Sequence, residues 1–452
     1  MSTTPSGIAD LEPLARRREQ RAWYWYDWAN SAYVTTVTTV LFAPYLIAVA
    51  KEAAVDNRVQ LLGFIPVAPG ALPSYVITFS TVLSAVLLPL LGAVADRTEH
   101  KKQLLAAFAW AGALSASLLF FVRGDNWQLG ATAVIVANLC LGASVVVNDS
   151  ILCLIATEDE RDGVSSRGWA FGYLGGGILL LVNLAMVLLH ESLGISEAFA
   201  VRLSMLSAAI WWAGFTLIPF LRLRNYRPEH VVSLGGSPIR QSFGQLWATL
   251  REVRNYKMTW TFLLAYLFFN DGIQTVIASS STYGSEQLGF GQSTLIATIV
   301  VVQVVGIVGA LVFGKAAQRY GGRQVILAGL AVWMAIVTIA YFLPEGQIAP
   351  FLVLAVAIGL VLGGTQALAR SFFSLLIPRG KEAEYFSFYH ACERGTSWFG
   401  TLTFGLVYQL TDSYRPAIFA LILFFVVGGL LLLRVDPARG IREAGNTPPA
   451  VV

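Results

Sequence analysis

The sequence predicts an all-α integral membrane protein with twelve transmembrane helices in two pseudo-symmetric six-helix bundles. Hydrophobic residues make up 56% of the 452 residues and charged residues only 13%, a balance that a multi-span membrane protein requires and a soluble core of this length does not. The mean hydropathy of +0.64 agrees. The apolar residues also fall into twelve runs, each close to the roughly 20 residues with which a helix crosses a hydrocarbon layer of about 30 Å.

Charged or turn-forming residues separate the twelve predicted spans. In chain order the spans cover residues 23–50, 74–95, 104–122, 129–156, 168–190, 199–221, 258–283, 293–316, 324–343, 349–376, 385–410 and 416–433. The longest polar interval contains seven Lys or Arg residues and divides the spans into two groups of six. The predicted organisation is a tail at 1–22, a first bundle at 23–221, a cytoplasmic linker at 222–257, a second bundle at 258–434 and a tail at 435–452.

The Lys and Arg residues are distributed unevenly between the two sides of the predicted membrane protein. Twenty-five of the 31 lie on the side that holds both termini, five lie on the opposite side, and Arg394 lies inside a span. Because cytoplasmic loops carry the excess of Lys and Arg, we expect both termini in the cytoplasm. This topological role accounts for the net charge of +4, and no nucleic-acid partner is expected.

The sequence lacks the motifs of enzymes and cofactor sites. Cys140, Cys153 and Cys392 lie in predicted spans without disulfide or metal-ligand spacing. The four histidines form no His-x-x-x-His pair, and the Gly-rich run at 172–177 follows no strand and lacks a P-loop lysine. We expect no cofactor, no metal and no enzymatic activity. Two other classes of membrane protein also bury acidic residues in helices and stay open as alternatives: a membrane-embedded enzyme and a lipid scramblase.

A short basic turn recurs at the same place in both predicted bundles. Residues 92–97 read Gly-Ala-Val-Ala-Asp-Arg, and residues 314–319 read Gly-Lys-Ala-Ala-Gln-Arg. Such internal repeats place substrate sites near the midplane between two halves. Charged residues at the turns can pair in one conformation and separate in another. We assign gating to Asp96, Arg97, Arg319 and Arg323.

Ionisable side chains inside the predicted spans need a partner, a water-filled cavity or a function, because a charge in the hydrocarbon centre is costly. Counted at about 1.5 Å per residue from the cytoplasmic end of each span, Asp271 lies about 20 Å into its span. Asp149 and Glu393 lie about 10 to 15 Å into theirs. We expect these three carboxylates to be the proton-coupling candidates. The alternatives are a structural hydrogen bond to a neighbouring span for Asp271, hydration near the inner surface for Asp149, and pairing with another helix for Glu393.

An acid followed three residues later by a carboxamide occurs at 27–30 and again at 271–274. Asp27 lies about 6 Å into its span, where Trp23 and its aromatic neighbours form an interfacial belt or hold an ammonium group by cation–π contact. Arg394 could receive a substrate carboxylate and His390 suits a proton relay, although either could pair with another helix instead. The substrate-binding candidates are Asp27, Asn30, Tyr33, Asn148, Asn270, Gln274, Gln366, His390 and Arg394.

The run Tyr-Asp-Trp-Ala-Asn-Ser-Ala-Tyr at 26–33, together with the turn at 92–97, resembles the major facilitator superfamily and, within it, the vacuolar-effluxer branch. Three further stretches are similar to the same branch: 165–177, 364–371 and 377–389. The chain departs from the branch at Cys153, where a proline is expected, at Glu99 and His100 in the first basic turn, and at Gln318 in the second. Weaker gating contacts at the cytoplasmic face are one expected consequence.

The resemblance implies a secondary active transporter that moves a small polar solute by alternating access around a cavity lined mainly by spans one, four, seven and ten. Amino-acid efflux is the best-known activity of one member, so we expect amino acids or related metabolites as exported cargo and the proton gradient as the driving force. The expected partners are the solute, protons and the lipid bilayer, for a monomeric protein. The short loops resemble those of bacterial members and favour a plasma membrane over a vacuole.

Overall fold

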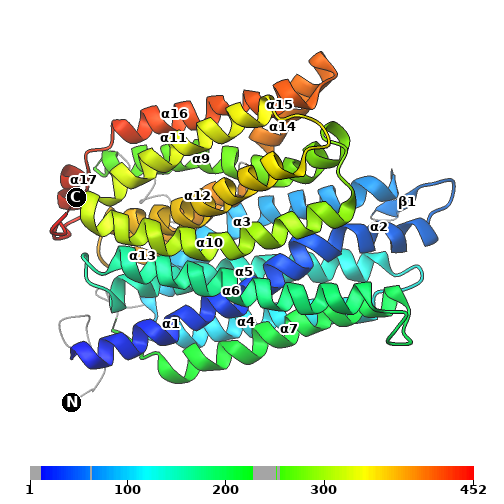
Figure 1. Ribbon diagram of the computed structural model, residues 1–452. Helices are drawn as coiled ribbons and strands as arrows, with labels where there is room; N and C mark the ends of the chain where they lie inside the picture. The colour runs from blue at the N-terminus through cyan, green and yellow to red at the C-terminus, as the bar shows by residue number, and fades with distance from the viewer. Residues whose placement is uncertain (1–11, 62–63, 228–250, 252–254, 396, 452) are drawn as a thin grey trace.

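The computed structural model describes residues 12–451 apart from 62–63, 228–250, 252–254 and 396, and leaves out the side chains at 61, 292–293, 296, 394–395 and 397–398. The protein is a bundle of long helices that run back and forth along one direction (Figure 1). Helix α1 begins and helix α17 ends at the same end of the bundle, which we call the termini face. The opposite end is called the distal face.

The first half of the chain forms the lower layer of Figure 1. Its elements are α1 (Pro13–Tyr33), the π-helical turn η2 (Val34–Leu41), α2 (Phe42–Glu52), β1 (Val59–Leu61), β2 (Ile65–Val67), η3 (Pro69–Ala71), α3 (Leu72–Arg97), α4 (Lys101–Ser117), η4 (Leu118–Phe121), α5 (Trp127–Ile155), α6 (Arg161–Leu188) and α7 (Glu197–Arg222). Local sequence explains several boundaries: Pro13 occupies the first turn of α1, where a missing N–H costs nothing, and Ser196 caps α7 by accepting from the Phe199 N–H.

The second half repeats the arrangement. Its elements are α9 (Lys257–Thr282), η5 (Tyr283–Gln287), α10 (Gln292–Tyr320), α11 (Gly322–Tyr341), α12 (Ile348–Leu375), α13 (Glu382–Gly395), α14 (Ser397–Thr411), α15 (Tyr414–Ala420), α16 (Ile422–Leu433) and α17 (Pro437–Glu443). Gly321 separates α10 from α11 with a φ of +86°, a backbone conformation that only glycine adopts readily.

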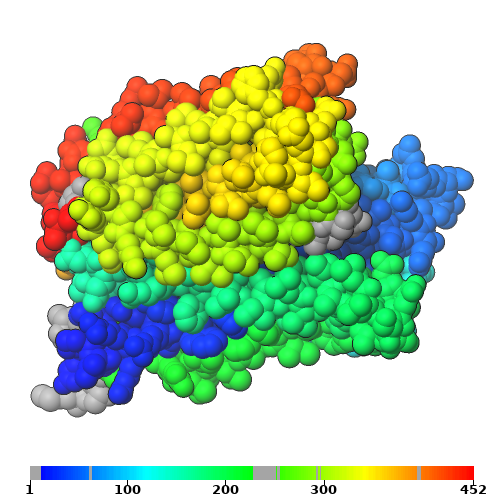
Figure 2. Space-filling model, in the orientation of Figure 1, coloured from blue at the N-terminus to red at the C-terminus, as the bar shows by residue number. Residues whose placement is uncertain are grey.

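Two apolar cores underlie the two layers. One core gathers buried residues between Ala22 and Tyr226, and the other gathers buried residues between Phe262 and Ile441. Across the boundary, α3 and α5 pack against α13, and α6 packs against α10 and α12. Figure 2 shows the two halves as adjoining bodies. In the described part of the chain, eleven helical segments are long and apolar enough to cross a membrane.

The predicted span at 385–410 is not one continuous helix. Helix α13 ends at Gly395 and α14 begins at Ser397, and neither half is long enough alone to cross a bilayer. One other feature of this structure was not predicted. Strands β1 and β2 form a small antiparallel hairpin in the 51–73 loop, with Val59 opposite Val67, and this hairpin projects at the distal face (Figure 1).

The first span extends further toward the termini face than predicted. Because α1 starts at Pro13, Asp27 lies about 20 Å along the helix at about 1.5 Å per residue, counted from a first part of the helix that is rich in arginine. The belt interpretation is wrong for Trp23 and Tyr26, because both rings are completely buried inside the protein. The predicted N-terminal tail at 1–22 therefore includes the first three turns of α1.

Candidate functional site

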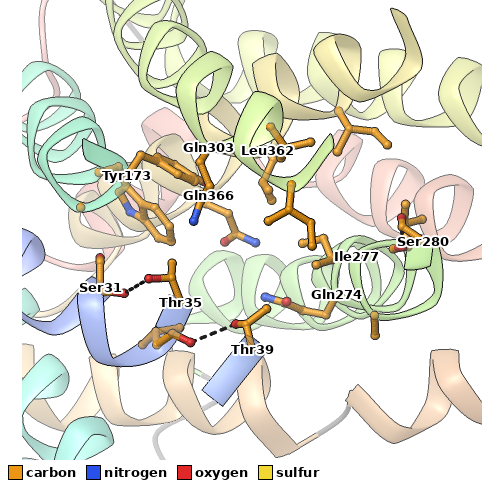
Figure 3. A pocket seen from close by; sticks show the side chains of 18 of the residues that line it. Ser31, Thr35, Thr39, Tyr173, Gln274, Ile277, Ser280, Gln303, Leu362 and Gln366 are labelled. Atoms are coloured by element: carbon orange, nitrogen blue, oxygen red, sulfur yellow. Dashed lines mark hydrogen bonds between the residues drawn. The ribbon is translucent and has the colours of Figure 1, made fainter. Parts of the chain in front are cut away.

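A cavity of about 530 Å³ lies between the two halves. Its walls come mainly from α1, η2, α5, α6, α9, α10, α11, α12 and α13 and are largely aliphatic. Figure 3 shows the polar side chains that interrupt this apolar wall: Ser31, Thr35, Thr39, Tyr173, Gln274, Ser280, Gln303 and Gln366. The carboxamides and hydroxyls can hydrogen-bond a polar group, while the aliphatic wall suits an apolar one.

Charged residues gather at the end of the cavity nearest the termini face, which we call the floor. Asp149 lies six residues before the end of α5 and Arg370 five before the end of α12, and both helices end at the termini face. His390 lies eight residues after the start of α13. All three line the cavity, as do Asp27 and Glu393.

Arg370 joins three helices of the first half to α12. Its Nη2 lies 3.0 Å from Oδ2 of Asp27 and its Nη1 lies 3.2 Å from Oδ1 of Asp149. The guanidinium also donates from Nε to the Ser165 hydroxyl at 2.9 Å and from Nη2 to the Ser165 carbonyl at 3.0 Å. Arg370 is 4% exposed and Asp149 is 1% exposed. Such buried charges are tolerated only when they are paired and hydrogen-bonded.

The floor is completed by close packing around Arg370. Its guanidinium lies 4.7 Å from the ring centre of Trp23 and 5.6 Å from that of Trp169, within reach of a cation–π interaction. Gly168 makes the approach possible, because a Cβ at this position would overlap Oδ2 of Asp27 and crowd Nη2 of Arg370. The close approach of Asp27 and Arg370 therefore requires a glycine at position 168.

His390 makes a second connection between the halves. Its Nε2 lies 2.9 Å from Oδ2 of Asp149 on α5, and its Nδ1 lies 2.6 Å from Oε2 of Glu393, one turn along α13. Asp149 therefore contacts Arg370 with one oxygen and His390 with the other. The two N-terminal-half acids, Asp27 and Asp149, face two bases of the C-terminal half.

The predicted carboxamide candidates lie in different places. Gln366 lines the cavity and donates to Oδ1 of Asn270 at 2.8 Å. Asn270 in turn donates to the Glu393 carbonyl at 3.4 Å, so this pair braces α13. Gln274 and Asn30 line the cavity, and Asn30 donates to the Tyr26 carbonyl. The Asn148 amide is buried outside the cavity lining, and neither of its atoms has a hydrogen-bond partner among the described residues.

Two further candidates, Asp271 and Tyr33, are not among the described residues that line the cavity. Asp271 points toward α14, where its Oδ2 accepts the Gly400 N–H at 2.8 Å. Tyr33 stacks on Trp212 and donates to Asn138 at 3.2 Å. The side chain of Arg394 lies outside the described part of the structure.

The predicted gating residues behave differently from one another. Asp96 accepts the Ala383 and Glu384 N–H groups at 2.9 and 2.8 Å, which caps α13 across the boundary, and it also pairs with Lys101. In contrast, Arg323 donates to the Leu432 and Leu433 carbonyls inside its own half. Arg319 lies over the Tyr320 ring. Among these residues, Asp96 thus links the two halves through its bonds to the start of α13.

Several residues that connect the halves are not among the candidates expected from the sequence. Arg370 falls near the cytoplasmic end of its predicted span. Ser165, Arg161 and Asp162 precede the predicted start of theirs; Arg161 donates to the Ser374 carbonyl at 2.8 Å, and Asp162 accepts from the Ser371 hydroxyl. An Arg near the end of an apolar run was the available signal for Arg370, but this signal alone does not distinguish a loop cation from a buried one.

Comparisons with known proteins agree with this arrangement. A model of the Atg22-like vacuole effluxer family matches residues 15–445. The chain is 33% identical to an uncharacterized MFS-type transporter, YxiO of Bacillus subtilis, over 96% of this chain and 98% of that protein. It is 27% identical to autophagy-related protein 22 of Yarrowia lipolytica, over 82% and 76% of the two chains.

Solved structures show the same fold at low sequence identity. The proton:xylose symporter XylE superposes with a TM-score of 0.72 at 10% identity, covering 96% of this chain and 99% of that one. The major facilitator FucP in its outward conformation superposes with a TM-score of 0.68 at 14% identity, covering 93% and 98%. The architecture is therefore that of a major facilitator.

Proposed function

This chain belongs to the Atg22-like vacuole effluxer family of major facilitator transporters, and from that premise we propose that it exports small zwitterionic solutes, amino acids in the first place, by alternating access coupled to protons. It is a multi-span membrane protein and not an enzyme. The observation that carries the proposal is the pairing of Arg370 with Asp27 and Asp149 at the cavity floor.

The ion pairs have to open for the halves to part at the termini face. Asp27 and Asp149 belong to one half and Arg370 to the other. Separating a buried pair without replacing its partners costs about 3–5 kcal/mol. A solute that offers both an ammonium and a carboxylate replaces both partners at once, because its carboxylate takes over Arg370 and its ammonium takes over the acids. A solute of one sign compensates only one side.

The cavity walls support amino acids over larger zwitterions. A volume of about 530 Å³ falls in the range of small-molecule sites. Aliphatic residues such as Val34, Leu141 and Ile299 line it above the charged floor, so an apolar side chain can lie against the wall while the charged groups reach the floor. Hydroxyl and carboxamide groups give additional hydrogen bonds for polar side chains.

The distribution of Lys and Arg supports the orientation of the transporter. We assign the termini face to the cytoplasm, because it carries 25 of the 31 basic residues. The floor and the contacts of Asp96 then close the cytoplasmic side, while the cavity extends toward Thr39, Ser281 and Phe351 near the distal face. We propose that this is the outward-facing state of a monomer in a plasma membrane.

Transport by purified protein in liposomes tests the proposal. Each of the twenty radiolabelled amino acids is offered under an imposed pH gradient, and we expect uptake of a subset of them. We expect no uptake of neutral sugars or of analogues that lack either the ammonium or the carboxylate. Asp27→Asn is expected to abolish the uptake, whereas Arg442→Lys, an exposed basic position, is expected to leave it unchanged. Uptake that needs only one charged group would contradict the proposal, and lipid flipping without any solute uptake would favour a scramblase.

A further inference from the structure

Both ring nitrogens of His390 contact a carboxylate. Nδ1 lies 2.6 Å from Oε2 of Glu393 and Nε2 lies 2.9 Å from Oδ2 of Asp149. The imidazole is 5% exposed and Asp149 is 1% exposed, so bulk water does not replace the contact between them, whereas Glu393 also lines the cavity. We call His390, Asp149 and Glu393 the floor triad.

The two contacts fix how many protons the floor triad holds. An ionised carboxylate only accepts hydrogen bonds, and a neutral imidazole carries one N–H. Each of the two hydrogen bonds needs a proton of its own, so the triad contains two protons, either both on His390 or one on the imidazole and one on a carboxyl group. With both on His390, the ring is an imidazolium between two carboxylates.

The number of protons on the floor triad changes the net charge that each half presents at the floor. On the C-terminal half, Arg370 and a protonated His390 outweigh Glu393 and leave one positive charge. Facing it, Asp27 and Asp149 carry two negative charges. Loss of one proton from His390 leaves the C-terminal half without net charge at this level. The attraction that holds the halves together at the floor is then weaker, because only Arg370 still pairs as a cation with Asp27 and Asp149. The remaining ring packed against the imidazole is Tyr389, which adds no charge when neutral.

We propose that the floor triad is a proton-binding site whose occupancy sets whether the two halves hold together at the termini face. This inference rests on the proposed function, because it assigns the coupling proton to His390 rather than to Asp271. The proton leaves from Nδ1 through Glu393, which lines the cavity, to water there, and His390 keeps its other N–H. Asp271 has no comparable access, because its described contact is the Gly400 amide outside the cavity lining.

Distance measurements across the termini face test the proposal without any cargo. Spin labels at Glu99→Cys and Lys315→Cys, two exposed positions in different halves, are placed in a variant whose Cys140, Cys153 and Cys392 are replaced by alanine. Double electron–electron resonance in lipid nanodiscs is recorded between pH 5 and 9. The population with the longer distance is expected to rise with pH, by at most about tenfold per pH unit, the limit for one proton.

Substitutions at His390 separate this site from a structural one. His390→Gln is expected to remove the pH dependence, and His390→Lys, which keeps one positive charge, is expected to hold the short distance at every pH. The matched control is His100→Gln, at an exposed histidine of the termini face, which is expected to respond like the parent protein. A His390→Gln variant that responds to pH like the parent, or a parent without any response, would overturn the proposal. A pH response without any amino-acid uptake would instead contradict the proposed function alone.

Discussion

Nη2 of Arg370 lies 3.0 Å from Oδ2 of Asp27, and this contact ties the tenth span to the first over a sequence separation of 343 residues. The bond is one of a set on the floor that includes Asp149, Ser165 and His390. Since every one of these bonds crosses from one half to the other, the floor is both the base of the cavity and the closure between the halves. Any step that opens the termini face has to break these bonds.

Arg370→Lys is expected to weaken both folding and transport. A lysine keeps the charge but cannot donate to Asp27, Asp149 and Ser165 together or stack on Trp23 as a planar group. Loss of one hydrogen bond to a charged partner is worth on the order of 2 kcal/mol. The expected result is a lower unfolding temperature and a large loss of uptake. The control Arg379→Lys, at an exposed residue, should change neither; a wild-type-like Arg370→Lys would show that the planar fork is not needed.

Gly168→Ala is expected to force Asp27 and Arg370 apart, because the added methyl group would overlap Oδ2 of Asp27. Overpacking of this kind typically costs about 1–3 kcal/mol. Thermal unfolding of the purified protein measures the effect. Gly214→Ala in α7 is the matched control, since nothing lies within 4 Å of a Cβ there, and alanine is favoured over glycine in a helix. Equal unfolding temperatures for the two variants would contradict the close packing.

Asp96→Asn is expected to loosen the termini face. The carboxylate caps the first N–H groups of α13 and pairs with Lys101, and a negative charge at a helix N-terminus contributes about 0.3–2 kcal/mol. The open population should rise by up to about thirtyfold, because each 1.4 kcal/mol changes an equilibrium about tenfold. The modification rate of Cys153 by a maleimide reports this opening, because Cys153 lies 4.0 Å from the Ser374 carbonyl of the other half. Glu99→Gln, three residues away and exposed, should leave the rate unchanged.

Asp271→Asn is expected to keep transport and its response to pH. The oxygen of an asparagine can still accept the Gly400 N–H, which holds α14 against α9. Asp271→Leu removes that acceptor and should destabilise the protein, since it leaves a buried N–H unpaired at a cost of about 1–3 kcal/mol. Uptake with and without a pH gradient distinguishes the roles. If Asp271→Asn transports but loses the effect of the gradient, the coupling proton belongs to Asp271 after all.

The sequence by itself determined the membrane class, the family resemblance and eleven of the twelve predicted spans, the exception being the span at 385–410. Hydropathy depends on about 20 consecutive residues, and short motifs such as the one at 26–33 are equally local, so both can be recognised without a structure. The same local signals pointed to Asp27, Asp149, Glu393 and His390 as ionisable residues inside spans, and the structure brings these four together.

Only the tertiary structure decided which of these charges meet. Arg370 sits near the end of a span, where local hydropathy does not distinguish a loop cation from a buried one, and its role follows from partners on α1, α5 and α6. Asp271 lies deeper by residue count but faces α14 instead of the cavity, because the direction of a side chain depends on how its helix is rotated against its neighbours. Helix rotation and packing between the halves arise from contacts far apart in the chain, and a single sequence does not contain them in local form.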